Sequence, residues 1–171
     1  RFMNFTFSRK FYILLAIGLL PLSVSWNLPL LRNLVFIFDG LLIIAALTDW
    51  LISRKLPVEL TLRRSLTKRM AIGDETDVVI EMENGTTRNF HLTLKDEFPP
   101  EMKLSGERTE SFTLKAQTTA KMFYALTPPK RGRYEFGRTA VRHLSRLGLV
   151  WCQSYLGDSL SVKVYPNMRR A

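Results

Sequence analysis

The sequence has very little of the chemistry that enzymes and metal proteins use. Its single cysteine, Cys152, excludes an internal disulfide and fits a reducing compartment. Its two histidines, His91 and His143, are far apart in the chain, and no cysteine or acidic cluster accompanies them. No Ser, His and Asp residues occur at a spacing typical of a catalytic triad. We therefore predict no enzyme, and no catalytic, cofactor-binding or metal-binding residues.

Acidic residues are also scarce. The 171 residues include 25 Lys and Arg but only 15 Asp and Glu. Such a surplus favours contact with anionic lipid, nucleic acid or acidic protein without choosing among them. Between Lys130 and Arg146 there are six cations and one acid, Glu135. These cations form a candidate interaction patch: Lys130, Arg131, Arg133, Arg138, Arg142 and Arg146.

The patch begins in the segment TPPKRGRYEFG, which has two interpretations. Its prolines end a strand, and Gly132 permits a bend before a new strand that directs Tyr134 and Phe136 to one face. On the structural interpretation, the first two cations are solvated and Arg133 pairs with an acid such as Glu135. On the functional interpretation, the patch contacts anionic headgroups or an acidic partner protein. Nucleic acid is not expected, because aromatic residues are not interleaved for base stacking.

Charge is absent, or nearly so, from two long apolar runs. Phe11 to Leu31 has no charged residue, and Leu34 to Ile52 has two acids. A helix of about 20 apolar residues crosses the hydrocarbon core of a bilayer. The sequence therefore predicts a two-helix transmembrane hairpin, with spans at about 11–31 and 34–52. A cleaved signal peptide is the alternative for the first run, but this run is longer than a signal peptide's apolar region and no A-x-A site follows it.

The flanking cations predict the orientation of the hairpin. Cations lie at its two outer ends: Arg1, Arg9, Lys10, Arg54, Lys55, Arg63 and Arg64. The tip between the spans has only Arg32. By the positive-inside rule, we expect both termini to lie in the cytoplasm. Trp26 and Trp50 suit the two interfaces. The Arg63-Arg64 pair is expected to be solvated.

Two acids interrupt the second span. Asp39 lies five positions inside it, where a carboxylate is costly, so it is a candidate intramembrane polar site. The alternative is that Asp39 sits near the outer headgroups or bonds to Ser23, Ser25 or Asn27. Asp49 lies near the cytoplasmic end and is expected to be an interface residue within reach of Arg54 or Lys55.

After Lys55 the hydrophobic period changes to two, and no helical stripe of ten residues appears. Alternating segments begin at Val58, Phe90, Ala120 and Leu160, and further strands are expected at DVVIEMEN and SFTLKA. Six to eight short strands with turn residues between them predict a β-sandwich of immunoglobulin or fibronectin type III character. The expected organisation is a membrane hairpin at 1–55 and a sandwich at 56–171.

The order of several motifs resembles the amino-terminal half of the bacterial domain-of-unknown-function family 58. The matching positions are Asn84, Asp96-Glu97-Pro99-Pro100, Pro128 to Tyr134, Ser145 to Leu149 with Trp151, and Val164-Tyr165-Pro166. Members of that family usually continue into a von Willebrand factor A-like domain, often with a D-x-S-x-S metal site. That domain is absent here, and Asp158-Ser159-Leu160-Ser161 has the wrong spacing, so no metal is assigned. We expect the chain to be part of a longer protein.

The resemblance implies partners as well as a fold. It implies work with a MoxR-type AAA+ ATPase and with von Willebrand factor A proteins, in chaperone-like or envelope-related processes. Our leading hypothesis is a non-enzymatic scaffold anchored in the lipid bilayer, with a cytoplasmic sandwich. The alternative is an extracytoplasmic carbohydrate- or peptide-binding module on a membrane stalk.

Overall fold

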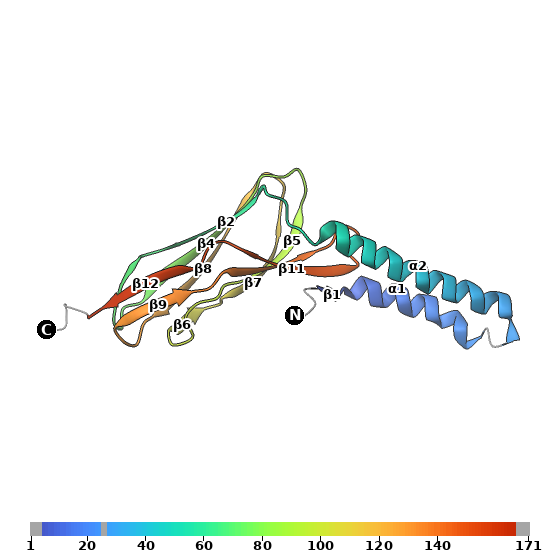
Figure 1. Cartoon of the computed structure of the whole chain (residues 1–171), viewed down its shortest axis with the longest axis horizontal. Coiled ribbons are helices and arrows are strands. Elements are labelled where there is room, and N and C mark those ends of the chain that lie inside the picture. The colour runs from blue at the N-terminus through green and yellow to red at the C-terminus, as the bar shows by residue number, and fades with distance from the viewer. Residues whose placement is uncertain (1–4, 25–26, 167–171) are drawn as a thin grey trace. The chain divides into compact units, whose positions relative to one another are not determined.

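The structure, a computed structural model, describes residues 5–24 and 27–166 (Figure 1). The chain divides into two compact units. A helical unit contains Arg1–Leu56 and Arg142–Ser154, and a sandwich unit contains Pro57–Val141 and Tyr155–Ala171. The helical unit thus includes a segment that the sequence had placed with the strands. Arg1, Ser25 and Trp26, which entered the predictions above, lie outside the described residues.

Prolines set the bounds of the helices. After the short strand β1 (Phe5–Phe7), α1 covers Arg9–Leu19, with the Ser8 side chain capping its first turn. A 3₁₀ helix, η1 (Leu20–Ser23), contains Pro21, and Pro29 begins α2 (Pro29–Ser53), a position where its missing N–H costs nothing. The expected first span is therefore not one helix, because α1 ends at Leu19 and α2 already begins at Pro29.

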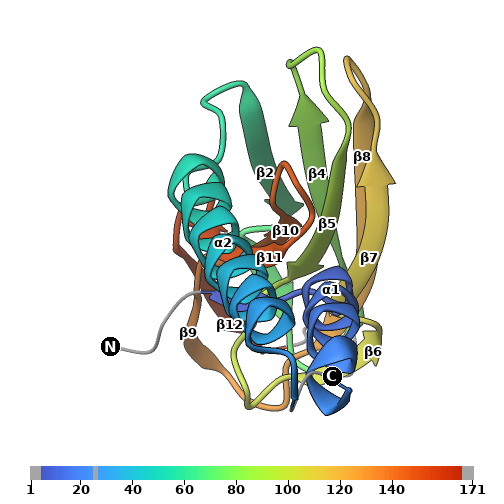
Figure 2. The same ribbon diagram turned by 90° about the vertical axis from the view of Figure 1, so that its right-hand side faces the viewer.

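The two helices lie side by side (Figures 1 and 2). Gly18 of α1 permits the close approach, because a Cβ at this position would lie 2.5 Å from the ring of Phe38 on α2. Buried side chains from both helices and from the second segment of the helical unit share one core: Phe11, Leu42, Ala46, Leu149, Val150 and Cys152. The unit is therefore held together by residues about 100 positions apart.

The second segment of the helical unit contains a tight turn between β10 (Thr139–Leu144) and β11 (Val150–Leu156). Ser145 N donates to Val150 O at 2.9 Å, and Gly148 N donates to Ser145 O at 3.1 Å. Gly148 has φ +76°, which favours glycine. β1, which the sequence analysis did not predict, pairs antiparallel with β11, with Phe5 opposite Cys152. We call residues 145–149 the 145–149 turn.

The sandwich unit is built from short strands. Their bounds are β2 Leu60–Leu66, β3 Arg69–Ala71, β4 Thr76–Asn84, β5 Phe90–Lys95, β6 Lys103–Gly106, β7 Thr109–Leu114, β8 Thr119–Thr127, β9 Gly132–Phe136 and β12 Leu160–Tyr165. One sheet has the order β2-β4-β8-β6, another has the order β3-β12-β9, and β5 pairs with β7. The predicted β-sandwich is confirmed.

The period-two pattern located most of these strands. Phe90, Leu92 and Leu94 are all buried, as their alternation predicted. β8 ends at Thr127, directly before the two prolines, and β9 begins at Gly132. The prediction for Val58 was wrong: its side chain is 92% exposed, because β2 begins at Leu60 and Val58 lies before the strand.

Among the described residues, one helix is long and apolar enough to cross a membrane. It is α2, whose 25 residues have a mean hydropathy of 2.1 in their most apolar window. Only 17% of that window is buried inside the structure. A helix of this kind near the amino terminus is a candidate membrane anchor or signal sequence.

Candidate functional site

The first half of the predicted cationic patch surrounds β9. Lys130, Arg131 and Arg133 are exposed. Arg133 Nε donates to Ser161 Oγ at 2.7 Å, and Arg133 forms no ion pair in the described residues, so the expected pairing with an acid such as Glu135 was wrong. The pairing fails because the neighbour of Glu135 across the sheet is Ser161, while Arg133 lies opposite another cation, Lys163.

Two other patch residues, Arg138 and Arg142, have partners for their side chains. Arg138 donates to the backbone oxygens of Gly157 at 3.0 Å and Tyr155 at 2.9 Å. Arg142 lies over the ring of Trp151, 5.4 Å from its centroid, and donates to Thr6 Oγ1. Arg142 and Arg146 belong to the helical unit, whereas the other four cations belong to the sandwich unit.

A buried ion pair lies in the sandwich unit. Asp96 is fully buried, and the Arg64 side chain is 6% exposed. Arg64 Nε donates to Asp96 Oδ2 at 3.1 Å, Arg64 Nη2 donates to the other carboxylate oxygen, and Thr139 Oγ1 donates to Asp96 Oδ1 at 2.8 Å. The expectation that Arg64 is solvated was wrong. The register of β2 directs Arg63 outward and Arg64 inward, to a carboxylate that lies 32 positions further along the chain.

Tyr124 completes this network. Its hydroxyl donates to Asp96 Oδ2. Burial, with the adjacent negative charge of Asp96, raises the pKa of Tyr124 well above its ordinary value, so the phenol stays protonated and remains a donor. Asp96 accepts from three side chains, as a buried carboxylate requires. The Asp-Glu motif of the family resemblance therefore marks a buried structural acid in this chain.

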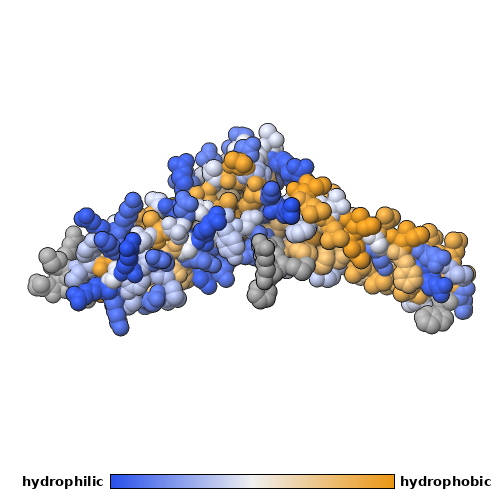
Figure 3. Space-filling model, in the orientation of Figure 1, coloured by the Kyte–Doolittle hydropathy of each residue, from blue (hydrophilic) through white to orange (hydrophobic). Residues whose placement is uncertain are grey.

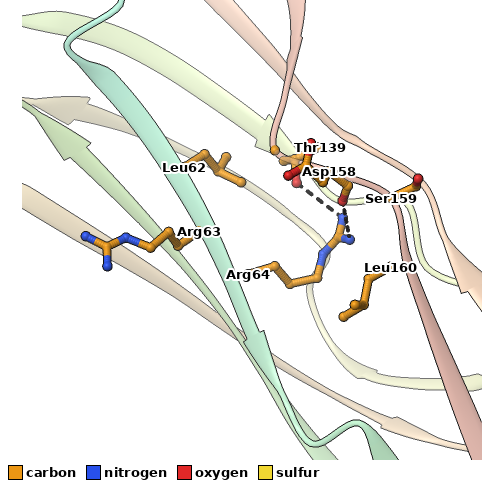
Figure 4. A pocket seen from close by; sticks show the side chains of 8 residues that line it. Leu62, Arg63, Arg64, Thr139, Asp158, Ser159 and Leu160 are labelled. Atoms are coloured by element: carbon orange, nitrogen blue, oxygen red, sulfur yellow. Dashed lines mark hydrogen bonds between the residues drawn. The ribbon is translucent and has the colours of Figure 1, made fainter.

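Arg64 also forms one wall of a pocket of about 280 Å³. Figure 4 shows its guanidinium pointing toward Thr139 and Asp158, while Arg63 points away. Arg64 Nη1 lies 3.4 Å from Asp158 O, and Arg64 Nη2 donates to Gly137 O at 2.6 Å. Because Asp96 already balances the charge of Arg64, the pocket has no free buried charge, and we assign no ligand to it.

Asp49 is a buried acid of the helical unit that accepts four hydrogen bonds. It is 2% exposed. Its Oδ2 accepts from Ser145 Oγ at 2.5 Å and Leu149 N at 3.3 Å, and its Oδ1 accepts from Leu147 N at 3.0 Å. Ser53, one helical turn further on, donates to Oδ1 at 3.4 Å. The expected pairing of Asp49 with Arg54 or Lys55 was wrong, because its carboxylate binds the 145–149 turn. Its place at a membrane interface stays a prediction.

The start of α1 binds the same turn. Ser8 N donates to Leu149 O at 2.8 Å, and Ser8 Oγ donates to Gly148 O at 2.5 Å. Lys10 Nζ donates to Leu147 O at 3.0 Å. The 145–149 turn therefore joins the first residues of α1 to the last residues of α2. The Ser-x-Leu-Gly-Leu motif of the family resemblance occupies this turn.

His143 lies beside the turn and is buried. Its Nε2 is 2.7 Å from Ser53 O, so Nε2 carries the proton, while Nδ1 has no hydrogen-bond partner among the described residues. Burial lowers the pKa of His143 below its ordinary value. A second proton on Nδ1 would place an unpaired N–H and a charge in an apolar setting.

Acidification is therefore expected to destabilise the helical unit. Because the folded pKa of His143 is below the ordinary value of about 6.5, the unfolded chain binds the proton more readily. Stability is complete above about pH 7 and falls as the pH drops through about 6.5 toward the folded pKa, by at most about 1.4 kcal/mol per pH unit. Hydrogen exchange of the amides in 142–154 measures the effect. His143→Gln, which still donates to Ser53 O, should flatten the pH profile, and identical profiles for the two proteins would contradict this.

Cys152 is buried, and desolvation together with the negative charge of Asp49 raises its pKa to about 11. At neutral pH we expect it to react with iodoacetamide at least about 100-fold more slowly in the folded protein than in urea, because the thiolate is the nucleophile. Mass spectrometry measures the rate. An exposed thiol in Glu107→Cys/Cys152→Ala is the control and should react at similar rates in both states. Rapid alkylation of folded Cys152 would be inconsistent with this burial.

Asp39 lies between the helices, beside Gly18. A Cβ on Gly18 would be 2.7 Å from Asp39 Oδ1, and this oxygen is buried without a hydrogen-bond partner among the described residues. The suggested bond to Ser23 is not formed, since the Ser23 hydroxyl donates to Leu20 O at 2.9 Å. Asp39 stays a candidate intramembrane polar site.

The described residues contain no group of three or more His, Cys, Asp or Glu side chains able to hold a metal ion. His91, the second histidine of the sequence, is exposed on β5, where its Nδ1 lies 2.8 Å from Thr113 Oγ1.

No family model and no curated protein matches the chain. Among solved structures, a native alpha-2-macroglobulin from Escherichia coli, spanning domain MG7 to the C-terminus, is 16% identical with a TM-score of 0.51. The match covers 63% of this chain and 17% of that one. The sandwich has an immunoglobulin-like fold. At this identity the likeness concerns the fold alone.

Two other solved structures are more weakly similar. The CARDB domain of a Pyrococcus furiosus protein, in complex with di-metal ions, is 12% identical with a TM-score of 0.42, over 62% of this chain and 87% of that one. A cohesin module from a Clostridium perfringens family 33 glycoside hydrolase is 14% identical with a TM-score of 0.46, over 65% of this chain and all of that one.

Proposed function

We propose that this protein is a non-enzymatic membrane scaffold. In this proposal α1 and α2 cross the bacterial inner membrane as a hairpin, and the sandwich unit is a cytoplasmic module for binding other proteins. The observation that carries the proposal is the apolar surface of the helices. Large apolar side chains of α2 are exposed along its length: Leu30, Leu34, Phe36, Ile37, Phe38, Leu41, Ile43, Ile44, Leu47, Leu51 and Ile52 (Figure 3).

Such a surface is far larger than soluble monomers expose, and lipid is the environment that fits it. At 1.5 Å per residue, α2 is about 37 Å long, enough to cross a hydrocarbon core of about 30 Å. The 15 residues of α1 and η1 extend about 25 Å.

The 145–149 turn argues against a cleaved signal sequence. Asp49 near the end of α2 and Ser8 before α1 are both hydrogen-bonded to this turn. Cleavage after the helices would remove these partners from the turn. It would also expose Leu149, Val150 and Cys152, which are buried in a core shared with the helices, and exposure of apolar side chains is costly. The contacts therefore support helices that stay in the mature protein.

The cations support cytoplasmic termini. Arg9 and Lys10 begin α1, Arg54 and Lys55 follow α2, and the opposite tip has Arg32. Arg64 no longer counts toward this asymmetry, because it is buried with Asp96. The remaining excess still favours the cytoplasmic side for both termini.

A labelling experiment tests the anchor and its orientation together. In the Cys152→Ala background, Glu107→Cys places a thiol on the sandwich unit and Asn27→Cys places one at the tip, both at exposed positions. An impermeant maleimide added to spheroplasts is expected to label position 27 and to label position 107 only after lysis. Alkaline extraction should leave the protein in the membrane pellet.

The opposite labelling pattern would support the alternative, an extracytoplasmic carbohydrate- or peptide-binding module. Release of the protein by alkali would overturn the transmembrane hairpin. The native Cys152 is unsuitable for this test, because it is buried wherever the protein is located.

The proposed partners rest on the family resemblance. A MoxR-type AAA+ ATPase and von Willebrand factor A proteins of the same bacterium are the expected partners. Co-purification of the ATPase with the full chain from detergent-solubilised membranes, in the presence of ATP, tests this. Failure to recover the ATPase would remove the partnership and leave the membrane anchor untouched.

A further inference from the structure

The sheet β3-β12-β9 places three cations in one cross-strand row. Lys163 on β12 is paired in register with Arg69 on β3 and with Arg133 on β9. Directly paired residues project from the same face of a sheet, and all three side chains are exposed. On the opposite face, Met70, Val162 and Val164 are buried. The row therefore runs across the outer face, from one edge strand to the other.

This row is unfavourable for the isolated protein. Like charges directly opposite each other destabilise a sheet. In the described structure the ion pairs involve Arg63, Arg64 and Lys121, so no member of the row has an acidic partner within ion-pair distance. Arg133 instead donates to the neutral Ser161 hydroxyl. The row thus maintains a concentrated positive charge that the fold itself does not neutralise.

The row ends at an open strand edge. β9 is the last strand of its sheet, and in the described residues it pairs only with β12. In an antiparallel pair, alternate residues direct their N–H and C=O groups away from the neighbour, so β9 presents unpaired backbone groups along its free side. Two more exposed cations, Lys130 and Arg131, directly precede it.

We infer that the free edge of β9 binds an extended acidic segment of a partner protein, which adds to the sheet as a strand. Its backbone pairs with β9. One of its carboxylates lies directly opposite Arg133, next to the row Arg69–Lys163–Arg133, and neutralises part of the positive charge of this row. Strand addition supplies affinity through main-chain hydrogen bonds and selectivity through alternate side chains. The inference specifies partner chemistry for the scaffold proposed above and rests on that function.

Protection of the edge against aggregation does not account for the whole row. Cations on edge strands do discourage pairing with other strands. However, Lys163 lies on the central strand, where no such protection is needed. The charge makes the edge selective for acidic strands. Glu135, two residues after Arg133 on the same face, disfavours a continuous polyanion such as nucleic acid and favours a segment with alternating residue types.

Fluorescence anisotropy with the full chain in detergent tests the inference. The probe is a labelled peptide that alternates Glu with Val or Thr. It has about ten residues, which is within the usual length of a strand. We expect saturable binding that weakens with salt, and new hydrogen-exchange protection of β9 amides. A peptide with Gln in place of Glu lacks the charge, and a peptide with a central Pro cannot complete the backbone pairing. Each should bind at least about tenfold more weakly than the Glu peptide.

Arg133→Ser should weaken binding of the Glu peptide about tenfold, in line with the loss of one charge-assisted contact. The matched control is Lys103→Ser. Lys103 is also an exposed cation on an edge strand, β6, but Thr127 lies opposite it. This variant should bind normally.

Several outcomes would overturn the inference: no binding of the Glu peptide, equal binding of the Gln or Pro peptide, equal loss with Lys103→Ser, or tighter binding of a single-stranded oligonucleotide. Each of these can occur while the alkaline-extraction and labelling results still support the membrane scaffold. The failure of one proposal is therefore distinguishable from the failure of the other.

Discussion

Asp96→Ala is expected to destabilise the sandwich unit by about 3–5 kcal/mol, since removing one partner of a buried ion pair leaves an uncompensated charge. The guanidinium of Arg64 would keep its buried position but lose both carboxylate oxygens. The hydroxyls of Tyr124 and Thr139 would lose their acceptor as well. Urea unfolding of the full chain, followed by circular dichroism and by hydrogen exchange in β5 and β8, measures the loss.

The matched control is the neighbouring surface pair. Arg63 Nη2 and Glu83 Oε2 are 3.7 Å apart, with side chains 76% and 53% exposed. Glu83→Ala should cost less than about 1 kcal/mol, because water screens such pairs. If both variants lost a similar free energy of unfolding, burial would not explain the contribution of the Arg64–Asp96 pair to stability.

Asp49→Ala is expected to release the 145–149 turn from α2. The donors Ser145 Oγ, Leu147 N and Leu149 N would lose their acceptor, at a cost of about 3 kcal/mol in total. About 3 kcal/mol corresponds to roughly 100-fold faster hydrogen exchange at the two amides. Nuclear magnetic resonance of the full chain in micelles measures exchange at these positions.

Thr48→Val serves as the control for that variant. Thr48 is adjacent in sequence but exposed, and its hydroxyl donates to Ile44 O within α2. Exchange at Leu147 and Leu149 should be unchanged in this variant. If Asp49→Ala also leaves the two amides protected, the turn must be held by other contacts, and the role assigned to Asp49 is wrong.

The sequence was informative wherever the structure depends on neighbours along the chain. The alternation of Phe90, Leu92 and Leu94 identified β5, and the prolines after Thr127 identified the end of β8. The start of β9 at Gly132 and the two faces of β9 also follow from local chemistry. Such features need only a period and a turn residue, and both are visible in a window of ten positions.

The polar contacts of the core were not predictable in the same way. Asp49 and Ser145 are 96 positions apart, and Arg64 and Asp96 are 32 apart, so no local pattern joins them. The cation row is hidden for a similar reason: it depends on the registers that bring Arg69 and Arg133 to Lys163. The family motifs did mark Asp96 and the 145–149 turn, but they did not reveal the partners of these residues.

The helical unit is assembled from two pieces of chain, and this has a consequence for biosynthesis. Ribosomes add about 5–20 residues per second, so roughly 5–20 s pass between completion of α2 and completion of the segment that ends at Ser154. During that interval the carboxylate of Asp49 has no turn to bind. Most of the sandwich unit must therefore be synthesised before the 145–149 turn can bind Asp49 and Ser8. A chain that stops before Arg142 contains both helices but lacks this turn.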